Sequence, residues 1–330
     1  MNLENQLEQL QELVEKQEPN ICEITVIKNG NVLYEGFWNG FAKGDAMHVM
    51  SVTKSVIALL IGIAIDQKRI RSLSQNIMEF FPDYKVKRGE KTIFDVTIRH
   101  LLTMSAPYKF KSEPWKKVCT SPDWTIAALD LIGGRKGITG DFKYTSLGIQ
   151  ILSGILEIAT GMRVIEFANQ YLFTPLGIPK HVMHGDSSKE DQFDFLMNKG
   201  PRKNEWYCDP QNRVTAGWGL TLSATDMAAI GEMCLNRGMY RGNRIVSEEW
   251  IDEMTVPYRK LGMEFGNLSY GYLWWIINAK THTFAAIGDG GNVIYVNTDK
   301  NIVVGVASTF KPRVFDRIDF IETKILPLFA

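Results

Sequence analysis

The chain has 330 residues, 45% of them hydrophobic, so it is long enough to bury a substantial core in one large domain or two lobes. Its 37 lysines and arginines balance 37 aspartates and glutamates. This balance argues against nucleic acid or an anionic membrane surface as the partner. We therefore expect chemistry on a small molecule or short peptide, with no nucleic-acid and no membrane partner.

The first ten residues are acidic and amphipathic, with leucines at helical spacing, and they lack the basic and apolar regions of a secretion signal. No apolar run reaches the ~18 residues that a membrane-spanning helix needs, since Gly62 and Asp66 interrupt the longest candidate. The four cysteines are scattered without a CxxC pair, which suits a reducing compartment. These features predict a first helix and a cytoplasmic protein.

Two β-prone runs at residues 21–27 and 32–37 flank Asn29-Gly30, a sequence typical of a hairpin turn. The longest apolar run of the chain, residues 56–65, comes next and follows Ser51-Val52-Thr53-Lys54. This run is apolar on nearly every face, as expected of a helix buried in the middle of a domain.

From about residue 69 to residue 203 the pattern is mostly helical, with a strong helix signal over 147–158. We expect this helix to begin directly after Tyr144-Thr145-Ser146 and to end at Thr160-Gly161. The polar stretch 180–212 is predicted to form surface loops that could cover the site. Ser223 and Asp226 have the spacing of a capping box, so another helix should start there.

The last third returns to β-prone runs at 270–277, 283–287, 293–296 and 302–307, followed by a closing helix over 313–329. The predicted fold class is therefore α/β (α+β): an antiparallel sheet built from both termini, flanked by helices, with an all-helical insert. Residues 1–68 and 204–330 would form the α/β sheet domain and 69–203 the helical domain. The active site would lie between the two domains.

The spacing of Ser51 and Lys54 places a hydroxyl and an amine on the same helical face, one turn apart. At a helix N-terminus, the backbone N–H of the serine is free to stabilise an oxyanion. A lysine in an apolar helix is desolvated, which lowers its pKa and lets it accept the serine proton. The alternatives are a chance tetrapeptide and a lysine that reaches from a core helix to water.

Three further groups of residues have more ordinary explanations when each is taken alone. Tyr144-Thr145-Ser146 could simply cap a helix. His181 and His184 form an HxxH pair in a polar loop without a third ligand, so we expect no metal site. Several aromatic residues could line an apolar acyl pocket, although aromatic residues in a sheet are more often core: Trp206, Tyr207, Trp218, Trp274 and Trp275.

Together, three motifs carry a resemblance: Ser51-Val52-Thr53-Lys54, residues 142–146 and the glycine-rich stretch 286–291. They occur in the order of the motifs of serine β-lactamases and penicillin-binding proteins, in particular the branch related to class C. The likeness spans nearly the whole chain, which most resembles the esterases and 6-aminohexanoate-oligomer hydrolases of this family. It implies a β-lactamase/transpeptidase-like fold and no cofactor.

The resemblance also implies roles for particular residues. Ser51 would be the acylated nucleophile, with Lys54 and Tyr144 sharing proton transfer. Ser146 occupies a substrate-contacting position where the family more often has asparagine. Trp218 belongs to a Gly-Trp-Gly segment that is similar to the family, and we expect it to contact substrate.

The third motif departs from the family, which usually has Lys or His, then Thr or Ser, then Gly. An ungapped register places Ala286-Ile287-Gly288 there, so that Gly288 lies at the substrate and the backbone N–H of Asp289 joins that of Ser51 in the oxyanion hole. The register Asp289-Gly290-Gly291 is the alternative. Both lack the cation that grips a β-lactam carboxylate. Taken alone, these glycines could mark a β-bulge.

These observations favour a serine hydrolase that forms an acyl-enzyme on a carboxylic ester, an amide or a short peptide-like substrate, with weak or no β-lactamase activity. One alternative is a non-catalytic sensor or binding protein that keeps the fold of a penicillin-binding protein. A true class C-type β-lactamase is the other. The sequence leaves the physiological substrate and the oligomeric state open.

Overall fold

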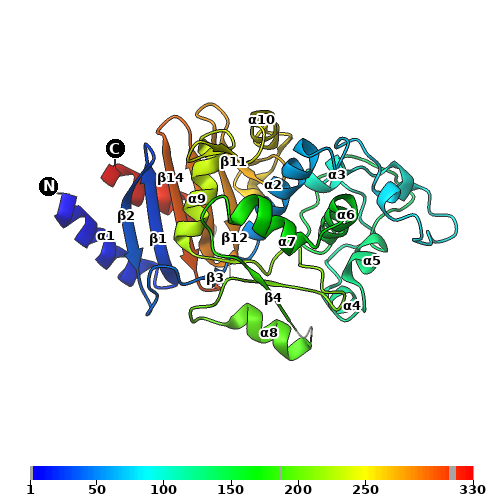
Figure 1. Ribbon diagram of the computed structural model, residues 1–330, viewed down its shortest axis with the longest axis horizontal. Helices are drawn as coiled ribbons and strands as arrows, with labels where there is room; N and C mark the ends of the chain where they lie inside the picture. Colours follow the sequence, from blue (N-terminus) through cyan, green and yellow to red (C-terminus); the bar gives the residue numbers. More distant parts are fainter. Residues whose placement is uncertain (1–2, 186–187, 312–316, 330) are drawn as a thin grey trace.

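The computed structural model describes residues 3–185, 188–311 and 317–329, and within them an antiparallel sheet of eight strands organises the fold (Figure 1). Its strand order is β2-β1-β14-β13-β12-β11-β10-β9. The strands are β1 Ile21–Lys28, β2 Asn31–Phe37, β9 Arg259–Lys260, β10 Ser269–Tyr270, β11 Trp275–Asn278, β12 Thr283–Gly288, β13 Asn292–Asn297 and β14 Ile302–Ser308.

The sheet is assembled from both termini, as the sequence predicts. Strands β1 and β2 form the expected hairpin, and β1 also pairs with β14, with Val26 opposite Val304. Strands β12, β13 and β14 follow one another as an antiparallel meander. Segments from the two ends of the chain therefore pair as neighbouring strands of one sheet.

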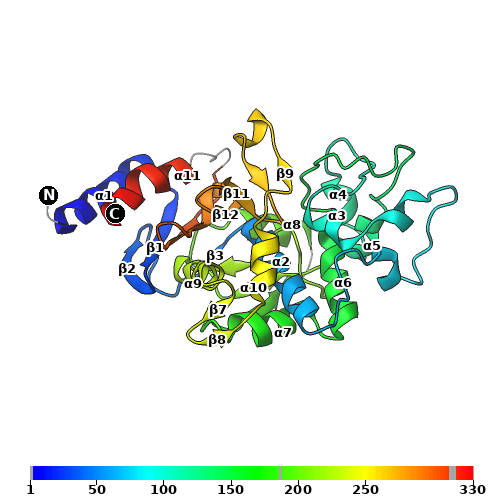
Figure 2. The same cartoon turned by 90° about the horizontal axis from the view of Figure 1, so that it is seen from above.

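Helices cover both faces of this sheet. On one face lie α1 (Leu3–Gln17) and the C-terminal helical turns, which run side by side (Figure 2): α11 Arg317–Phe320, η6 Ile321–Ile325 and η7 Leu326–Phe329. On the other face lie α9 (Ala224–Leu235) and α2 (Val52–Asp66). Residues 313–316 of the predicted closing helix lie outside the described residues.

Alternation along the central strand fills both cores. In β13, Val293 and Tyr295 join the core under α1 and the C-terminal turns, whereas Ile294 and Val296 join the core shared with α2 and α9. All six residues of β13 are buried. This strand is covered on both faces, which explains its continuous apolar sequence.

Most remaining helices lie beyond α2, away from the sheet (Figure 1). They are η1 Ile77–Phe80, η2 Thr92–Asp95, α3 Ile98–Leu102, α4 Trp115–Cys119, α5 Trp124–Leu129, α6 Gln150–Thr160, α7 Val164–Ala168 and η3 Asn169–Phe173. Helix α6 ends at Gly161 in the left-handed conformation, as predicted. It begins at Gln150 rather than directly after Ser146, because a turn comes first in which Thr145 Oγ1 accepts the N–H of Gly148.

The prediction that the insert is all helical is wrong at its end. Residues 180–212 are not only loops: they contain β4 (Val182–His184), α8 (Lys189–Met197) and β5 (Glu205–Tyr207), with β4 and β5 paired in parallel. This pairing joins two three-residue strands with α8 between them, too short for local patterns to reveal. The division into domains 1–68 with 204–330 and 69–203 stays a prediction.

The expected strand at 270–277 is also interrupted. It consists of β10 and β11, separated by a turn in which Leu273 has a positive φ of 57°. A Cβ on Gly271 would lie 2.2 Å from the carbonyl oxygen of Met254, so the chain passes very close to the end of α10 (Glu248–Met254). Smaller elements complete the fold: β3 Met47–His48, β6 Thr221–Leu222, β7 Met239–Tyr240, β8 Asn243–Arg244, η4 Met263–Phe265 and η5 Asp289–Gly291.

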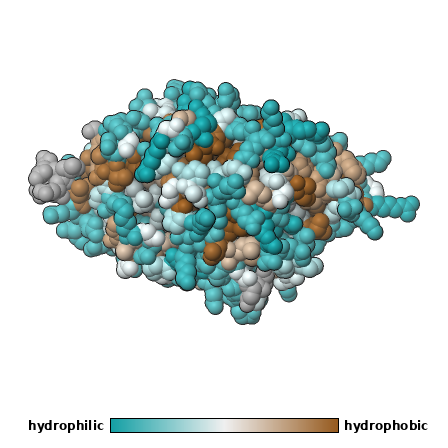
Figure 3. Space-filling model, viewed as in Figure 1, coloured by the Kyte–Doolittle hydropathy of each residue, from teal (hydrophilic) through white to brown (hydrophobic). Residues whose placement is uncertain are grey.

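The surface mixes hydrophilic side chains with small hydrophobic patches on the face drawn in Figure 3. In the part of the chain that the structure describes, every helix is too short or too polar to cross a bilayer.

Close packing of α9 on the sheet depends on Gly305 in β14. A Cβ at this position would lie 2.2 Å from the carbonyl oxygen of Ala224, so Gly305→Ala must push the start of α9 off the sheet. We expect a loss of about 1–3 kcal/mol in the free energy of unfolding, measured by urea denaturation. Gly200→Ala is the control, because its Cβ would meet only Asn198 Oδ1 at 3.6 Å. Equal stability of the two variants would contradict this packing.

Candidate active site

Ser51 lies where the chain turns into the buried helix α2. The preceding residue, Met50, has a positive φ of 52°, an uncommon conformation for a side-chain-bearing residue. Ser51 occupies the N-cap position of a helix whose residues are buried from Val52 to Ala64. Among the described residues, no acceptor takes the backbone N–H of Ser51. The hydroxyl and a free backbone donor therefore face the same region.

Lys54 lies one turn into α2 and is 1% exposed. Its Nζ lies 2.7 Å from Ser51 Oγ, 2.9 Å from Ser146 Oγ and 2.7 Å from the carbonyl oxygen of Gly217. Burial lowers the pKa of Lys54 to about 7, although the charges of Glu113 and Asp289 act in the opposite direction. A substantial fraction of this amine is therefore neutral near pH 7 and able to accept a proton.

Tyr144 reaches the same point from the loop before α6. The centre of its ring lies 4.9 Å from Lys54 Nζ, and its side chain hydrogen-bonds Ser51. The ring stacks on Trp275, with 5.8 Å between centroids. Burial raises the pKa of Tyr144 well above its ordinary value. The phenol thus stays protonated near neutral pH, where it can donate or relay a proton rather than act as a free phenolate.

Glu113 organises the loop that carries Tyr144. Its Oε1 accepts the backbone N–H groups of Ser146 and Leu147, each at 2.8 Å, and also the hydroxyl of Thr145. One carboxylate therefore fixes the segment between Tyr144 and α6. Sequence reasoning missed this residue, because it lies in an irregular stretch about thirty positions away and belongs to no motif.

Gly288, at the end of β12, passes directly beside Ser51. A Cβ on Gly288 would lie 2.3 Å from the carbonyl oxygen of Val49 and 3.0 Å from the backbone nitrogen of Ser51. By contrast, a Cβ on Gly290 would meet the carbonyl oxygen of Thr309 at 2.6 Å. The geometry therefore favours the register Ala286-Ile287-Gly288, in which Ala286 is fully buried and Asp289 is the first residue after β12.

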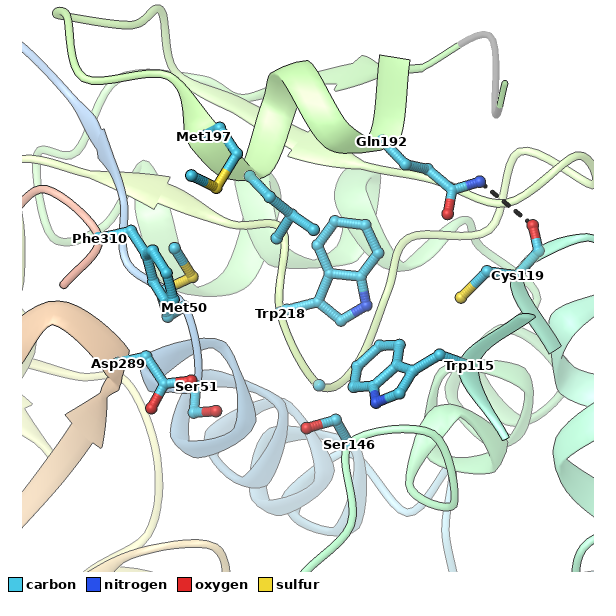
Figure 4. Close-up of a pocket in the computed structure, with 12 residues that line it drawn as sticks. Met50, Ser51, Trp115, Cys119, Ser146, Gln192, Met197, Trp218, Asp289 and Phe310 are labelled. Atoms are coloured by element: carbon cyan, nitrogen blue, oxygen red, sulfur yellow. Dashed lines mark hydrogen bonds between the residues drawn. The ribbon is translucent and has the colours of Figure 1, made fainter. Parts of the chain in front are cut away.

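A pocket of about 260 Å³ opens beside Ser51 (Figure 4). Its wall is mostly apolar and comes from seven separate segments of the chain. The lining residues are Met50, Ser51, Trp115, Cys119, Ser146, Gln192, Leu196, Met197, Gly217, Trp218, Asp289 and Phe310. Three of them belong to α8, so the stretch 180–212 reaches the site as a helix rather than as a loop.

Of the aromatic residues expected at the pocket, the structure brings only Trp218 to its wall. Trp206, Tyr207 and Trp274 are fully buried in the core, and Trp275 supports Tyr144 instead. Trp115 and Phe310 line the pocket but were not predicted. They follow no periodic pattern: Trp115 is the first residue of the short helix α4, and Phe310 lies two residues after the end of β14.

The two histidines of the HxxH pair have structural partners away from the pocket. His181 Nε2 lies 2.6 Å from the carbonyl oxygen of Thr221, and His184 bridges the carboxylates of Glu205 and Asp191. Over residues 3–185, 188–311 and 317–329, no group of three or more His, Cys, Asp or Glu side chains could hold a metal ion.

Comparison with known proteins agrees with this architecture. The family model described as Beta-lactamase matches residues 11–324. A 6-aminohexanoate-dimer hydrolase from Paenarthrobacter ureafaciens is 25% identical over 299 residues, which cover 84% of this chain and 70% of the relative.

Solved structures share the fold at lower identity. A penicillin-binding protein homologue from Caulobacter crescentus has a TM-score of 0.71 and 16% identity, covering 98% of both chains. A family VIII carboxylesterase has a TM-score of 0.69 and 15% identity, also covering 98% of both chains. Because the family model spans nearly the whole sequence, the chain belongs to the Beta-lactamase family and is a hydrolase of that family.

Proposed function

We propose that the protein is a serine hydrolase that cleaves a carboxylic ester or amide through an acyl-enzyme on Ser51. The observation that carries this proposal is the contact of 2.7 Å between Lys54 Nζ and Ser51 Oγ, at a lysine whose pKa burial lowers to about 7. A nucleophile and a neutral base in direct contact are what acyl transfer at neutral pH requires.

Acylation follows from this arrangement. As Ser51 Oγ attacks the carbonyl carbon, its proton passes to the neutral amine of Lys54. The backbone N–H groups of Ser51 and Asp289 stabilise the oxyanion that forms. When the tetrahedral intermediate collapses, the bond to the alcohol or amine breaks, and Tyr144 relays a proton from Lys54 to this leaving group.

Deacylation repeats the steps with water as the nucleophile. Water attacks the acyl carbon and loses a proton to the base formed by Lys54 and Tyr144. The bond to Ser51 Oγ then breaks, the carboxylic acid leaves, and the proton returns to Ser51. Ser146 Oγ lies 2.9 Å from Lys54 Nζ, in the position where it would contact the substrate.

The third motif, residues 286–288 at the end of β12, favours an ester or amide substrate over a β-lactam. Ala286 is fully buried and supplies no cation for a substrate carboxylate, and the residue that follows Gly288 is acidic. Two similar proteins are a 6-aminohexanoate-dimer hydrolase and a carboxylesterase, and their names point to the same two bond types.

The first prediction from this proposal concerns Ser51 itself. Ser51→Ala should abolish labelling by a fluorophosphonate and reduce hydrolysis of p-nitrophenyl acetate by at least about 1,000-fold. Ser55→Ala is the matched control, because Ser55 Oγ donates to the carbonyl oxygen of Leu273 and faces away from the site. Labelling that persists in the Ser51→Ala variant would contradict the proposal.

Intact-mass measurements during turnover separate the hydrolase from its alternatives. An enzyme returns to its free mass once the substrate is consumed, whereas a sensor stays acylated or binds without acylation. Nitrocefin turnover at ordinary enzyme rates would instead favour a true class C-type β-lactamase.

The second prediction concerns pH. Below about pH 7 Lys54 is increasingly protonated and cannot accept the proton of Ser51, so the rate of fluorophosphonate labelling should fall about tenfold per pH unit on the acid side. Above pH 7 the rate should level off. A rate that is constant between pH 5 and pH 9 would exclude Lys54 as the base.

The third prediction tests Glu113 as a positioning residue. Glu113→Ala removes the acceptor of two backbone N–H groups and should slow labelling about tenfold or more. Because the charge of Glu113 raises the pKa of Lys54, Glu113→Gln should move the midpoint of the pH profile to lower pH. Glu90→Gln is the matched control: Glu90 accepts the N–H of Gly134 and pairs with Lys109 outside the site. A profile unchanged in Glu113→Gln would assign Glu113 a purely structural role.

A further inference from the structure

A second pocket, which we call the basic pocket, lies outside the site described above. It is formed by residues within 106–111, between α3 and α4, and within 133–143, between α5 and α6, and its volume is about 460 Å³. Among the described residues, it shares no lining residue with the pocket beside Ser51. A molecule bound in the basic pocket is therefore not the acyl group that Ser51 would attack.

Positive charge is concentrated in the basic pocket. Five cationic side chains line it, together with one carboxylate, that of Asp141. The five are Lys109, Lys111, Arg135, Lys136 and Lys143. The chain as a whole has 37 basic and 37 acidic residues, so this excess of positive charge is a local feature of the fold. Such a concave cluster of one sign attracts ions of the opposite sign.

Four of these five cations have no ionic partner in the part of the chain that the structure describes. The exception is Lys109, whose Nζ lies 3.5 Å from a carboxylate oxygen of Glu90. The single carboxylate of Asp141, which accepts the hydroxyl of Thr139 at 2.7 Å, cannot balance the other four. Because like charges in one pocket repel each other, a bound anion would relieve this repulsion.

Lys143 distinguishes the basic pocket from a group of surface lysines. Its side chain is half-buried, with Nζ 4.2 Å from the centre of the Phe110 ring and donating to the carbonyl oxygen of Phe110. Burial lowers the pKa of this amine, although the charge of Glu113 acts in the opposite direction. An anion beside Lys143 would stabilise the charged form that burial disfavours.

The glycine-rich loop 133–137 supplies backbone donors as well as side chains. Gly133 and Gly134 have φ values of 114° and 127°, and a Cβ on Gly133 would lie 2.2 Å from Cδ of Glu90. Glycine is thus required for this tight turn. Within the described residues, no backbone carbonyl accepts the N–H groups of Arg135 and Lys136, which follow directly. Successive free N–H groups in a turn are typical of loops that bind phosphate.

We propose that the basic pocket binds a small, multiply charged anion of the phosphate class through Arg135, Lys136 and Lys143. A guanidinium group can donate two parallel hydrogen bonds to phosphate oxygens, and the lysine amines add charge. The volume of the pocket is within the range of about 300–1,000 Å³ that is typical of small-molecule sites. A free polyphosphate or nucleoside polyphosphate therefore fits better than a nucleic acid, which needs an extended surface.

Isothermal titration calorimetry of the full chain with tripolyphosphate tests this proposal. We expect one site with a Kd of about 10–100 μM at about 50 mM NaCl, and binding at least about tenfold weaker at about 500 mM NaCl, because salt screens exposed charges. Citrate, whose charge is carried by carboxylates, should bind at least about tenfold more weakly. Absence of tripolyphosphate binding would overturn the inference, and equally tight binding of citrate would overturn its assignment to the phosphate class.

Paired substitutions locate the site. Arg135→Gln combined with Lys136→Gln should weaken tripolyphosphate binding about tenfold or more. The matched control combines Lys116→Gln with Lys117→Gln, which removes the same charge from two adjacent exposed lysines of α4 that do not line the basic pocket. Its affinity should stay within about twofold of wild type. Equal weakening in both double variants would attribute binding to net charge and overturn the inference.

Lysine acetylation read by mass spectrometry locates the anion without any substitution. With tripolyphosphate at about ten times its Kd, acetylation of Lys136 and Lys143 should slow about threefold or more, whereas that of Lys116 and Lys117 should be unchanged. No protection at Lys136 and Lys143, or equal protection of all four lysines, would overturn the inference. These measurements require no turnover at Ser51, so their outcome is independent of the proposed hydrolysis.

Discussion

The burial of one lysine amine governs the arrangement of the site. An ammonium group inside a protein must either find acceptors or lose its proton, and Lys54 is poised between these two outcomes. Three oxygen atoms surround its Nζ, yet burial still lowers its pKa to about 7. Each of these acceptors comes from a different segment: the start of α2, the loop before α6 and the residue next to Trp218. The amine therefore hydrogen-bonds to parts of the chain whose contact no local sequence pattern predicts.

The charges of two carboxylates, Glu113 and Asp289, raise the pKa of Lys54 and so oppose the effect of burial. Glu113 is committed to backbone N–H groups of the Tyr144 loop, so its charge is a fixed part of the site. Asp289 makes no comparable bond among the described residues and lines the pocket. The basicity of Lys54 thus depends on one charge that hydrogen bonds hold in place and on another that lies exposed at the pocket wall.

Sequence patterns predicted what is local or repetitive. The Ser51 and Lys54 pair lies within one helical turn, and the β-prone runs near both ends of the chain predicted a sheet built from both termini. Tyr144 and the register of Gly288 rested on family resemblance, since nothing in their own neighbourhoods links them to Ser51. The role of Glu113 could not be predicted from local patterns, because the N–H groups that it accepts lie over thirty positions away.

The pocket wall was the least predictable part of the site. Trp115, α8 and Phe310 meet only in the folded chain, and their sequences carry no periodic signal that distinguishes a pocket wall from the surface. Of five aromatic residues that could have lined it, one does. Residue type predicts burial, whereas the shape of a cavity depends on long-range packing.

The meeting of the two chain ends in the sheet has a consequence for biosynthesis. Asn20 Nδ2 donates to the carbonyl oxygen of Thr309, a contact between residues 289 positions apart. On the ribosome, the β1–β2 hairpin emerges long before β14, and one edge of β1 stays open until almost the whole chain has been made. Ser51 is translated early, but β12, which ends beside it at Gly288, is translated near the end. The pocket beside Ser51 is therefore complete only after the last strands have joined the sheet.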